Sequence, residues 1–240
     1  MKSIREQFGI TLAKLATKNK KIVVVSCDLR SACKLSLFAK KYPKRFFEVG
    51  IAEANGVGIA SGLAMNDLKP YLASFSSFIS GKNIEIRCSI SYNNAPVVII
   101  GTHGGMIGAD GATQSGLQDI SVMRSMPNFH VYQPCSNEET KQIISHVSKL
   151  KVPSYVRIAR NIIPDFLPKK YKFKFKKIAT IKPGNKVAVI SSGPMLYNCL
   201  MAINKISKKK DFALFNLSTI KPIDKNYMLS KLKKFRKIIT

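Results

Sequence analysis

Residues 48–65 read EVGIAEANGVGIASGLAM, and the interpretation of the whole chain starts from them. After the leading Glu48, the only charged side chain is Glu53; the others are small or apolar apart from Asn55 and Ser61. Burying an isolated ionised carboxylate is costly. Because the run contains no Lys, Arg or His, Glu53 either points to solvent at the start of a helix or meets a partner that this sequence does not contain.

The composition fits one large or two modest globular domains, with 240 residues of which 45% are hydrophobic. No apolar run approaches the length of a membrane span. The first residues, MKSIREQFGITLAKLATKNKK, predict an amphipathic helix rather than a signal peptide. The five cysteines show no C-x-x-C pair and no metal-ligand spacing, which favours reduced thiols in a cytoplasmic protein.

The net charge of +27 is unevenly distributed. Residues 1–150 carry 18 basic against 10 acidic side chains, and residues 151–240 carry 22 against 3. Only 8 of the 40 basic residues are Arg, the residue that grips phosphates bidentately. Segment 169–184, KKYKFKFKKIATIKPG, interleaves rings and charges as single-strand nucleic-acid binders do, and it also alternates as an edge strand or a connecting ribbon would, with lysines on the solvent side. We favour the solvated ribbon and expect neither a nucleic-acid nor a membrane partner.

Apolar periodicity predicts an α/β fold with a doubly wound, mostly parallel sheet in residues 1–160. A basic linker, 161–184, and a second, incomplete α/β domain, 185–240, are expected to follow. The predicted helices are 3–18, 53–65, 78–92, one ending near Arg124, 137–150, 195–207 and 224–234. The predicted strands are 21–28, 45–50, 70–76, 95–103, 130–134, 154–160, 185–193 and 211–218, with a turn at 220–224 and a strand starting in 235–240.

The glycines of the opening stretch, Gly56, Gly58 and Gly62, do not have the spacing of a dinucleotide-binding fingerprint. They lie inside the predicted helix rather than in the turn before it. We expect them to permit close packing of that helix.

The Gly-rich loop 101–116, GTHGGMIGADGATQSG, follows a strand that reads as buried. Ligands of parallel sheets bind outside the carboxyl ends of strands, which makes His103 a candidate functional residue. His130 and His146 are expected to be structural or exposed. Asp110 remains open between a functional role and that of a turn residue before glycine.

Two further motifs have both a structural and a functional interpretation. Phe75 and Phe78, in SFSSFIS, either pack in the core or form a stacking platform for a planar ligand. Arg157 and Arg160, in RIAR, end a strand, where each either binds an anion or is a plain surface charge.

Taken in order, several segments resemble the carboxyl-terminal half of transketolase, in particular the type made as a separate subunit. They are FFEVGIAEANGVGIASGLA, PYLASFSSFISG, GTHGGMIGADGATQSGLQDISVMRSMPNFHVYQP, PSYVRIAR, and KVAVISSG with STIKPID. The resemblance extends from about residue 20 to the end of the chain. Deoxyxylulose-phosphate synthases share much of it, and the β-type subunits of 2-oxoacid dehydrogenases are more distantly similar.

This resemblance implies the thiamine diphosphate-binding fold and provides a partner for the lone acid. In the family, the acid at the position of Glu53 hydrogen-bonds the aminopyrimidine ring of thiamine diphosphate and thereby activates the cofactor. By the same resemblance, Phe75 and Phe78 stack on that ring, and Asp28 lies near the cofactor.

The resemblance also implies the substrate contacts. His103, the second catalytic candidate, and Asp110 match residues that contact the sugar near its reacting carbons. Arg160 and Ser31 match residues that contact the sugar phosphate. Gln114 stands where the family has a substrate-contacting histidine, and a glutamine carries neither a proton nor a positive charge to the sugar.

The chain departs from the family at other places as well. Ala54 replaces a glutamine, the loop from His103 to Asp110 is one residue shorter than in most transketolases, and segment 81–87 lacks one residue of a helix. The third domain of the family normally continues for several dozen residues beyond the position of Thr240.

The family motif that holds magnesium and the diphosphate, a GDG followed by an asparagine, does not occur in this sequence. In the family it lies in the amino-terminal half. The implied partner is therefore a separate amino-terminal subunit, in a dimer of heterodimers, that binds most of the Mg²⁺ and the diphosphate. We expect no metal ligand in this chain.

The implied function is transketolase activity in the pentose phosphate pathway, in which a two-carbon ketol unit moves between ketose and aldose phosphates. One alternative is a deoxyxylulose-phosphate-synthase-like enzyme that condenses pyruvate with glyceraldehyde phosphate. Gly81 argues against it, because the synthases have an arginine there. The other alternative is a degenerate, non-catalytic relative that binds polyanions through its basic second domain.

Overall fold

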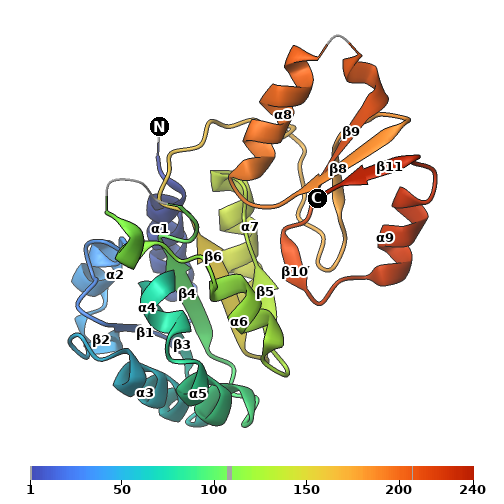
Figure 1. The fold of residues 1–240 in the computed structure, drawn as a ribbon. Coiled ribbons are helices and arrows are strands. Elements are labelled where there is room, and N and C mark those ends of the chain that lie inside the picture. Colours follow the sequence, from blue (N-terminus) through green and yellow to red (C-terminus); the bar gives the residue numbers. More distant parts are fainter. Residues whose placement is uncertain (1, 107–109, 207) are drawn as a thin grey trace.

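The computed structural model describes residues 2–106, 110–206 and 208–240, and its strands form two sheets (Figure 1). The first sheet has seven strands in the order β10-β5-β6-β4-β3-β1-β2, and the second has four in the order β11-β8-β9-β7. All pairings are parallel except those of β10 and β7, which are antiparallel edge strands. The predicted α/β class with mostly parallel sheets is confirmed.

The bounds of the elements are as follows. The strands are β1 (Ile22–Ser26), β2 (Phe46–Glu48), β3 (Lys69–Phe75), β4 (Val98–Thr102), β5 (His130–Tyr132), β6 (Ser154–Ile158), β7 (Ala179–Lys182), β8 (Val187–Ser191), β9 (Phe212–Asn216), β10 (Thr219–Lys221) and β11 (Lys237–Ile239). The α-helices are α1 (Ile4–Lys18), α2 (Ser36–Lys41), α3 (Glu53–Met65), α4 (Ser76–Ser80), α5 (Asn83–Glu85), α6 (Asp119–Ser125), α7 (Asn137–Val147), α8 (Met195–Lys205) and α9 (Lys225–Leu232).

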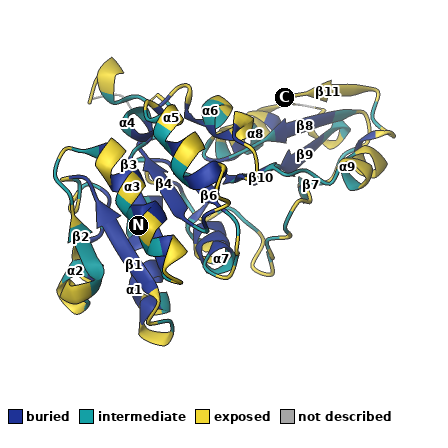
Figure 2. Cartoon of the chain, turned by 90° about the horizontal axis from the view of Figure 1, so that it is seen from below, coloured by how far each residue is buried: buried dark blue, intermediate teal, exposed yellow. Residues whose placement is uncertain are grey.

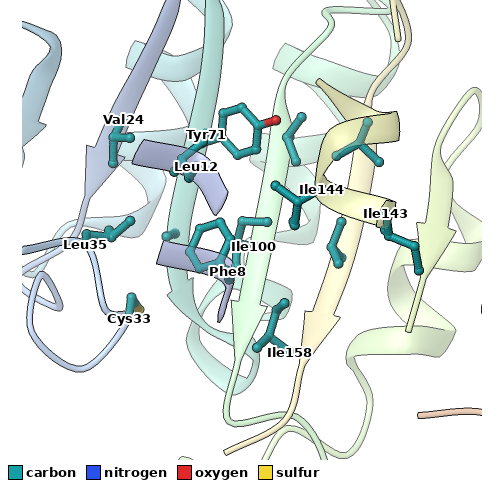
Figure 3. Packing of buried hydrophobic residues seen from close by; sticks show 14 of the residues in the cluster. Phe8, Leu12, Val24, Cys33, Leu35, Tyr71, Ile100, Ile143, Ile144 and Ile158 are labelled. Carbon is teal, nitrogen blue, oxygen red and sulfur yellow. The ribbon is translucent and has the colours of Figure 1, made fainter. Parts of the chain in front are cut away.

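Helices α1 and α7 cover one face of the first sheet. A capping box fixes the start of α1, where Ser3 and Glu6 each bond the backbone N–H of the other. Phe8 and Leu12 of this helix then meet the side chains of the central strands in a fully buried cluster (Figure 3). This core positions the amino-terminal end of α1 beside the carboxyl ends of the strands, where the candidate site lies.

Helix α3 covers the opposite face, and only one of its glycines has the predicted packing role. A Cβ on Gly56 would lie 3.2 Å from both Cys27 Sγ and Leu72 Cδ1, so the helix approaches the sheet closely there. A Cβ on Gly58 or Gly62 would meet nothing within 4 Å. The prediction for these two glycines is wrong because they lie on the exposed side of the helix, coloured yellow in Figure 2.

The single helix predicted over 78–92 is also wrong. Helix α4 begins earlier, at Ser76, and ends at Ser80, with Gly81 as its C-cap. The short helix α5 follows, and the backbone then widens into a π-helical turn, Ile86–Ser91. Glycine disfavours helix interiors, so the interruption at Gly81 has a local cause.

The second sheet carries α8 on one face and α9 on the other, each over its own apolar cluster. Two further strands lie outside the list of predicted strands. β7 is an edge strand of the second sheet within the basic linker 161–184, where an edge strand and a connecting ribbon were both open interpretations. β10 lies where a turn was expected and pairs with β5, so the second half of the chain adds a strand to the first sheet. The predicted helix 195–207 ends at Lys205, and its last residue lies outside the described ones.

In residues 171–176, half-buried aromatic rings alternate with exposed lysines, as the sequence suggested. Tyr171, Phe173 and Phe175 are half-buried, and the lysines between them are exposed. Phe175 packs against the rings of His130 and His146, at centroid distances of 5.1 and 4.9 Å. The edge-strand interpretation applies only to β7, because residues 169–178 form no strand. Phe173 and Phe175 pack on the core of the first sheet, and Ile178 packs in a cluster of the second.

A buried polar network ties the two halves together. Glu139 of α7 is fully buried and accepts hydrogen bonds from Asn216 of β9 (2.8 Å) and from the hydroxyl of Tyr171. The backbone N–H of Cys135 donates to the other carboxylate oxygen at 2.9 Å. Within the described part of the chain, no helix is long and apolar enough to cross a membrane. All five cysteines are free, as predicted.

Candidate active site

The candidate site lies where β1, β3, β4 and β6 end, at the carboxyl edge of the first sheet. A pocket of about 410 Å³ opens there, lined by Cys27, Asp28, Leu29, Ile51, Glu53, Phe78 and Lys82. Asp28 follows β1, Phe78 lies on the helix after β3, and Glu53 begins α3. The structure therefore brings together three of the side chains that the sequence assigned to one cofactor.

Glu53 is the buried acid of this pocket, with only 7% of its surface exposed. Its Oε1 accepts a hydrogen bond of 2.8 Å from the hydroxyl of Ser74, a fully buried residue of β3. Among the described residues nothing donates to its Oε2. The carboxylate therefore lies at the amino-terminal end of a helix, where negative charge is favoured, with one oxygen still available to a ligand.

Phe75 and Phe78 form one aromatic surface at the corner between β3 and α4. Their ring centroids are 5.3 Å apart and the planes differ by 21°, a stacked arrangement. On its other side, Phe75 meets the imidazole of His103, with centroids 3.8 Å apart. The rings thus connect the Glu53 pocket to the position after β4.

His103 is buried and has a left-handed backbone conformation, with φ of 57°. Its Nδ1 lies 3.0 Å from Thr102 Oγ1 and its Nε2 lies 3.3 Å from Arg5 Nη1. Burial, reinforced by the nearby guanidinium groups of Arg5 and Arg160, lowers the pKa of His103 to about 4. A non-glycine residue with positive φ is strained, and such residues gather at functional sites.

Asp110 and Arg160 form an ion pair of 2.8 Å beside this histidine. Each of the two side chains is about one third exposed, at 33% and 34%. Together with Arg5 they leave one net positive charge around a neutral imidazole. Such a cluster favours an anionic ligand.

The loop that carries Asp110 is fixed at its base. Gly104 and Gly105 bridge to Gly116, and Arg157 donates to the carbonyl oxygen of Gly116. Arg157 also forms an ion pair of 3.0 Å with the fully buried Asp119. Of the two arginines in RIAR, Arg157 therefore has a structural contact set and Arg160 lies at the candidate site. Residues 107–109 of the loop lie outside the described ones.

The remaining candidates lie farther from the pocket. Gln114 ends a 3-10 turn against α4, where its carbonyl oxygen accepts a hydrogen bond of 3.2 Å from Ser77 Oγ. Gln114 Oε1 is buried without a hydrogen-bond partner among the described residues. Ser31 is exposed and lines a different pocket, of about 610 Å³, together with Lys2, Glu6 and Lys34.

Seven residues of the described site were not identified from the sequence. They are Arg5, Cys27, Leu29, Ile51, Ser74, Lys82 and Thr102. Ser74 is the last residue but one of β3 and Thr102 is the last of β4, near the position that already pointed to His103. Nothing in the sequence distinguishes Arg5 from an ordinary basic residue on the first turn of an amphipathic helix.

Family comparison agrees with this architecture. Residues 1–165 match the family model described as the transketolase pyrimidine-binding domain, and residues 176–240 match the transketolase C-terminal domain.

Named relatives fall into two groups. The putative transketolase C-terminal section of Methanocaldococcus jannaschii is 34% identical over 240 residues, which covers 98% of this chain and 75% of that protein. One of the subunits of the apulose-4-phosphate transketolase of Phocaeicola vulgatus is 32% identical, with 100% and 78% coverage. The 1-deoxy-D-xylulose-5-phosphate synthase of Clostridium perfringens is also 32% identical over 97% of this chain, but the chain spans only 38% of that enzyme.

Solved structures share the fold. One described as "Split gene transketolase, inactive beta4 tetramer" superposes with a TM-score of 0.89 at 30% identity, over 98% of this chain and 78% of that one. The transketolase of Campylobacter jejuni superposes with a TM-score of 0.85 at 20% identity, over 98% and 41%, and shows the fold alone. The chain therefore belongs to the transketolase family and carries its pyrimidine-binding and C-terminal domains.

Proposed function

We propose that this chain is the carboxyl-terminal subunit of a two-chain, thiamine-diphosphate-dependent transketolase. It would transfer a two-carbon ketol unit from a ketose phosphate to an aldose phosphate. The observation that carries the proposal is Glu53, a buried carboxylate at a helix start that opens into a pocket with an aromatic wall.

The residues present fit the pyrimidine end of the cofactor. The pocket offers apolar walls from Ile51, Leu29 and Phe78, and one carboxylate with an available oxygen. Its volume of about 410 Å³ is typical of small-molecule sites. When bound, thiamine diphosphate supplies a carbon nucleophile for the ketose carbonyl.

Residues of this chain would orient the cofactor's ring and hold a proton against it. Glu53 would hold a proton at Oε2 against a ring nitrogen, while Ser74 keeps Oε1 in place. Phe75 and Phe78, both half-buried, would fix the plane of the ring and would shield one of its faces from water. Asp28, which lines the same pocket, would also contact the cofactor.

The sugar phosphate would occupy the cluster beside the aromatic surface. Arg160, supported by Asp110, would pair with the phosphate, and His103 would contact the sugar near the reacting carbons. Gln114 would contribute a hydrogen bond without charge in the place of a histidine. Ser31 stays a candidate phosphate contact in this proposal, from the edge of the neighbouring pocket.

The proposal includes a partner, the amino-terminal subunit. Two relatives that align with almost all of this chain, and of which the chain covers 75% and 78%, are named as the C-terminal section of a transketolase and as one of the subunits of another. Within the described residues, no group of three or more His, Cys, Asp or Glu side chains is placed to hold a metal ion. We therefore assign the Mg²⁺ and the diphosphate to the partner, in a cytoplasmic assembly with two copies of each chain.

Turnover by the reconstituted pair tests this proposal. Each chain alone, and the mixture with the amino-terminal subunit from the same organism, is assayed with thiamine diphosphate, Mg²⁺, a ketose phosphate and an aldose phosphate. Only the mixture is expected to form the ketol-transfer products. A mixture that assembles and binds cofactor but leaves the ketose phosphate unchanged would contradict the assignment.

One observation favours a second candidate, the pyruvate-condensing reaction of the synthases. Lys82 lines the pocket one residue after Gly81, the position where the synthases have an arginine. Its ammonium group would attract the carboxylate of pyruvate. The same mixture is therefore assayed with pyruvate and glyceraldehyde phosphate. Release of CO₂, lost in Lys82→Met, would favour this candidate over ketol transfer.

A further inference from the structure

The imidazole of His103 lies between two groups whose hydrogen-bonding roles are determined by chemistry. Its Nε2 is 3.3 Å from Arg5 Nη1, and a guanidinium group only donates. Nε2 must therefore accept. A neutral imidazole carries one N–H, which then lies on Nδ1 and points to Thr102 Oγ1 at 3.0 Å.

The environment of Thr102 accommodates the same tautomer. Its hydroxyl lies 3.3 Å from the carbonyl oxygen of Ser74 and 3.4 Å from Cys33 Sγ, and either atom can accept its hydrogen. Thr102 Oγ1 then has a lone pair for Nδ1–H of His103 at 3.0 Å. The contact with Arg5 determines the tautomer, and Thr102 provides the acceptor that this tautomer needs.

Arg5 also opposes the protonation of His103 at Nε2. A hydrogen on Nε2 would point at the Nη1 donor of Arg5, so a cationic imidazole would lose this contact and face a like charge. The charged groups facing the ring are Arg5, Asp110 and Arg160, and the two arginines outweigh the single acid. The lowered pKa of His103 agrees with this geometry.

Arg5 is itself held rigidly. Its Nη1 also donates to the carbonyl oxygen of Ala32 at 2.9 Å, and the capping box of Ser3 and Glu6 fixes the helical turn that bears it. On the other side, the ring of Phe75 packs against the imidazole, with its plane tilted by 37°. Helix α1 therefore holds the guanidinium group of Arg5 in place beside the ring of His103.

We propose that Arg5 is a positioning residue that holds His103 as the neutral Nδ1–H tautomer, with Nε2 as a hydrogen-bond acceptor. Its consequence for the substrate rests on the proposed function. A sugar hydroxyl would donate to Nε2 of His103, and recognition of the phosphate would fall to the arginine of the cluster. His103 would then select for a hydroxyl group rather than for negative charge.

Nitrogen NMR of the full chain labelled with ¹⁵N-histidine tests the tautomer directly. The protein has three histidines, so His130→Gln and His146→Gln assign the signals. At pH 7 the wild-type His103 is expected to show a protonated Nδ1 and an unprotonated Nε2. In Arg5→Met the Nε2–H tautomer is expected to become populated, and the titration midpoint to rise toward the ordinary value of about 6.5 for histidine.

Two further variants distinguish the loss of the Arg5–His103 contact from a general disturbance of the fold. Arg30→Met, at an exposed arginine, should leave the His103 signals as in the wild type. Arg5→Lys retains a cationic donor and is expected to restore the Nδ1–H tautomer at least in part. A wild-type His103 protonated at Nε2, or an Arg5→Met variant with unchanged ring signals, would overturn the proposal. The measurement needs neither cofactor nor partner, so the proposed function can fail while this assignment stands.

Discussion

Ser74 donates a 2.8 Å hydrogen bond to Glu53, which joins the end of β3 to the start of α3 across the buried floor of the pocket. The lone acid of the opening sequence thus has a partner in its own chain, but among the described residues only for one oxygen. A fully buried hydroxyl that supports a nearly buried carboxylate is an arrangement prepared for a ligand.

This relationship predicts the effect of Ser74→Ala on stability. Removing the hydroxyl leaves a buried carboxylate without its donor, so the free energy of unfolding is expected to fall by about 1–3 kcal/mol. In a Glu53→Gln background the same change should cost less, because a neutral amide loses less than a charge. Urea unfolding of the four variants measures the coupling. Equal costs in both backgrounds would mean that the contact does not support the charge.

The Arg157–Asp119 pair predicts a large effect at the base of the loop. Asp119 is fully buried and also accepts a hydrogen bond of 2.6 Å from the hydroxyl of Tyr155. Arg157→Met would leave this carboxylate without its cation, and the free energy of unfolding is expected to fall by about 3–5 kcal/mol.

An exposed pair in the same chain provides the matched control. Lys21 and Asp67 also form an ion pair, but their side chains are 58% and 86% exposed. Lys21→Met is expected to change the free energy of unfolding by less than about 1 kcal/mol. Chemical denaturation measures both variants. If Arg157→Met and Lys21→Met lowered the free energy of unfolding by similar amounts, the stabilising role of Arg157 beside the buried Asp119 would be contradicted.

Replacing a glycine of α3 by alanine is expected to change the stability differently on the two faces of the helix. Gly58→Ala adds a methyl group in open space and removes a poor helix former, so it should stabilise the isolated chain by about 1 kcal/mol. Gly56→Ala should gain less or destabilise, because its Cβ lies 3.2 Å from Cys27 Sγ and Leu72 Cδ1. Thermal unfolding of both variants decides this, and an equal gain at the two positions would contradict the packing described.

The buried histidines predict a loss of stability in mild acid. Burial lowers the pKa of His103 and of His130 to about 4, and it also lowers the pKa of His146. Their pKa in the unfolded chain is about 6.5, so between about pH 6.5 and 4 the unfolded state binds more protons. The free energy of unfolding should therefore be fully retained above about pH 6.5 and decrease as the pH falls toward about 4.

The variants used for signal assignment also check this pH dependence. His130→Gln removes one of the three titrating groups, and urea unfolding at several pH values should then show a shallower decrease than in the wild type. The double variant with His146→Gln should be shallower still. A pH profile that stays the same in both variants would show that other groups cause the loss.

The order of strands and helices was largely predictable because apolar periodicity reports burial directly. The strand that ends at Thr102 and the helix that starts at Glu53 were both identified in this way. β10 was missed because Thr219–Lys221 is three residues long and its pairing with β5 is set by tertiary contact. The break near Gly81 was missed because a helical period continues on both sides of it.

The site was predictable where residues lie at the carboxyl ends of strands, and much less so elsewhere. Glu53 stood out as a lone acid, and His103 as a polar residue directly after a buried strand. Arg5 was missed because the contact between Arg5 and His103 joins residues 98 positions apart, and a single sequence contains no signal for such a pairing.

Cofactor binding by the reconstituted pair tests the central claim most directly. Calorimetry is performed with thiamine diphosphate and Mg²⁺ on this chain alone, on its mixture with the amino-terminal subunit, and on mixtures with Glu53→Gln or with Glu138→Gln, an exposed control on α7. We expect saturable binding only in the mixture, retained in Glu138→Gln and weakened in Glu53→Gln. A mixture that assembles yet binds no cofactor while Glu53 is intact would contradict the account.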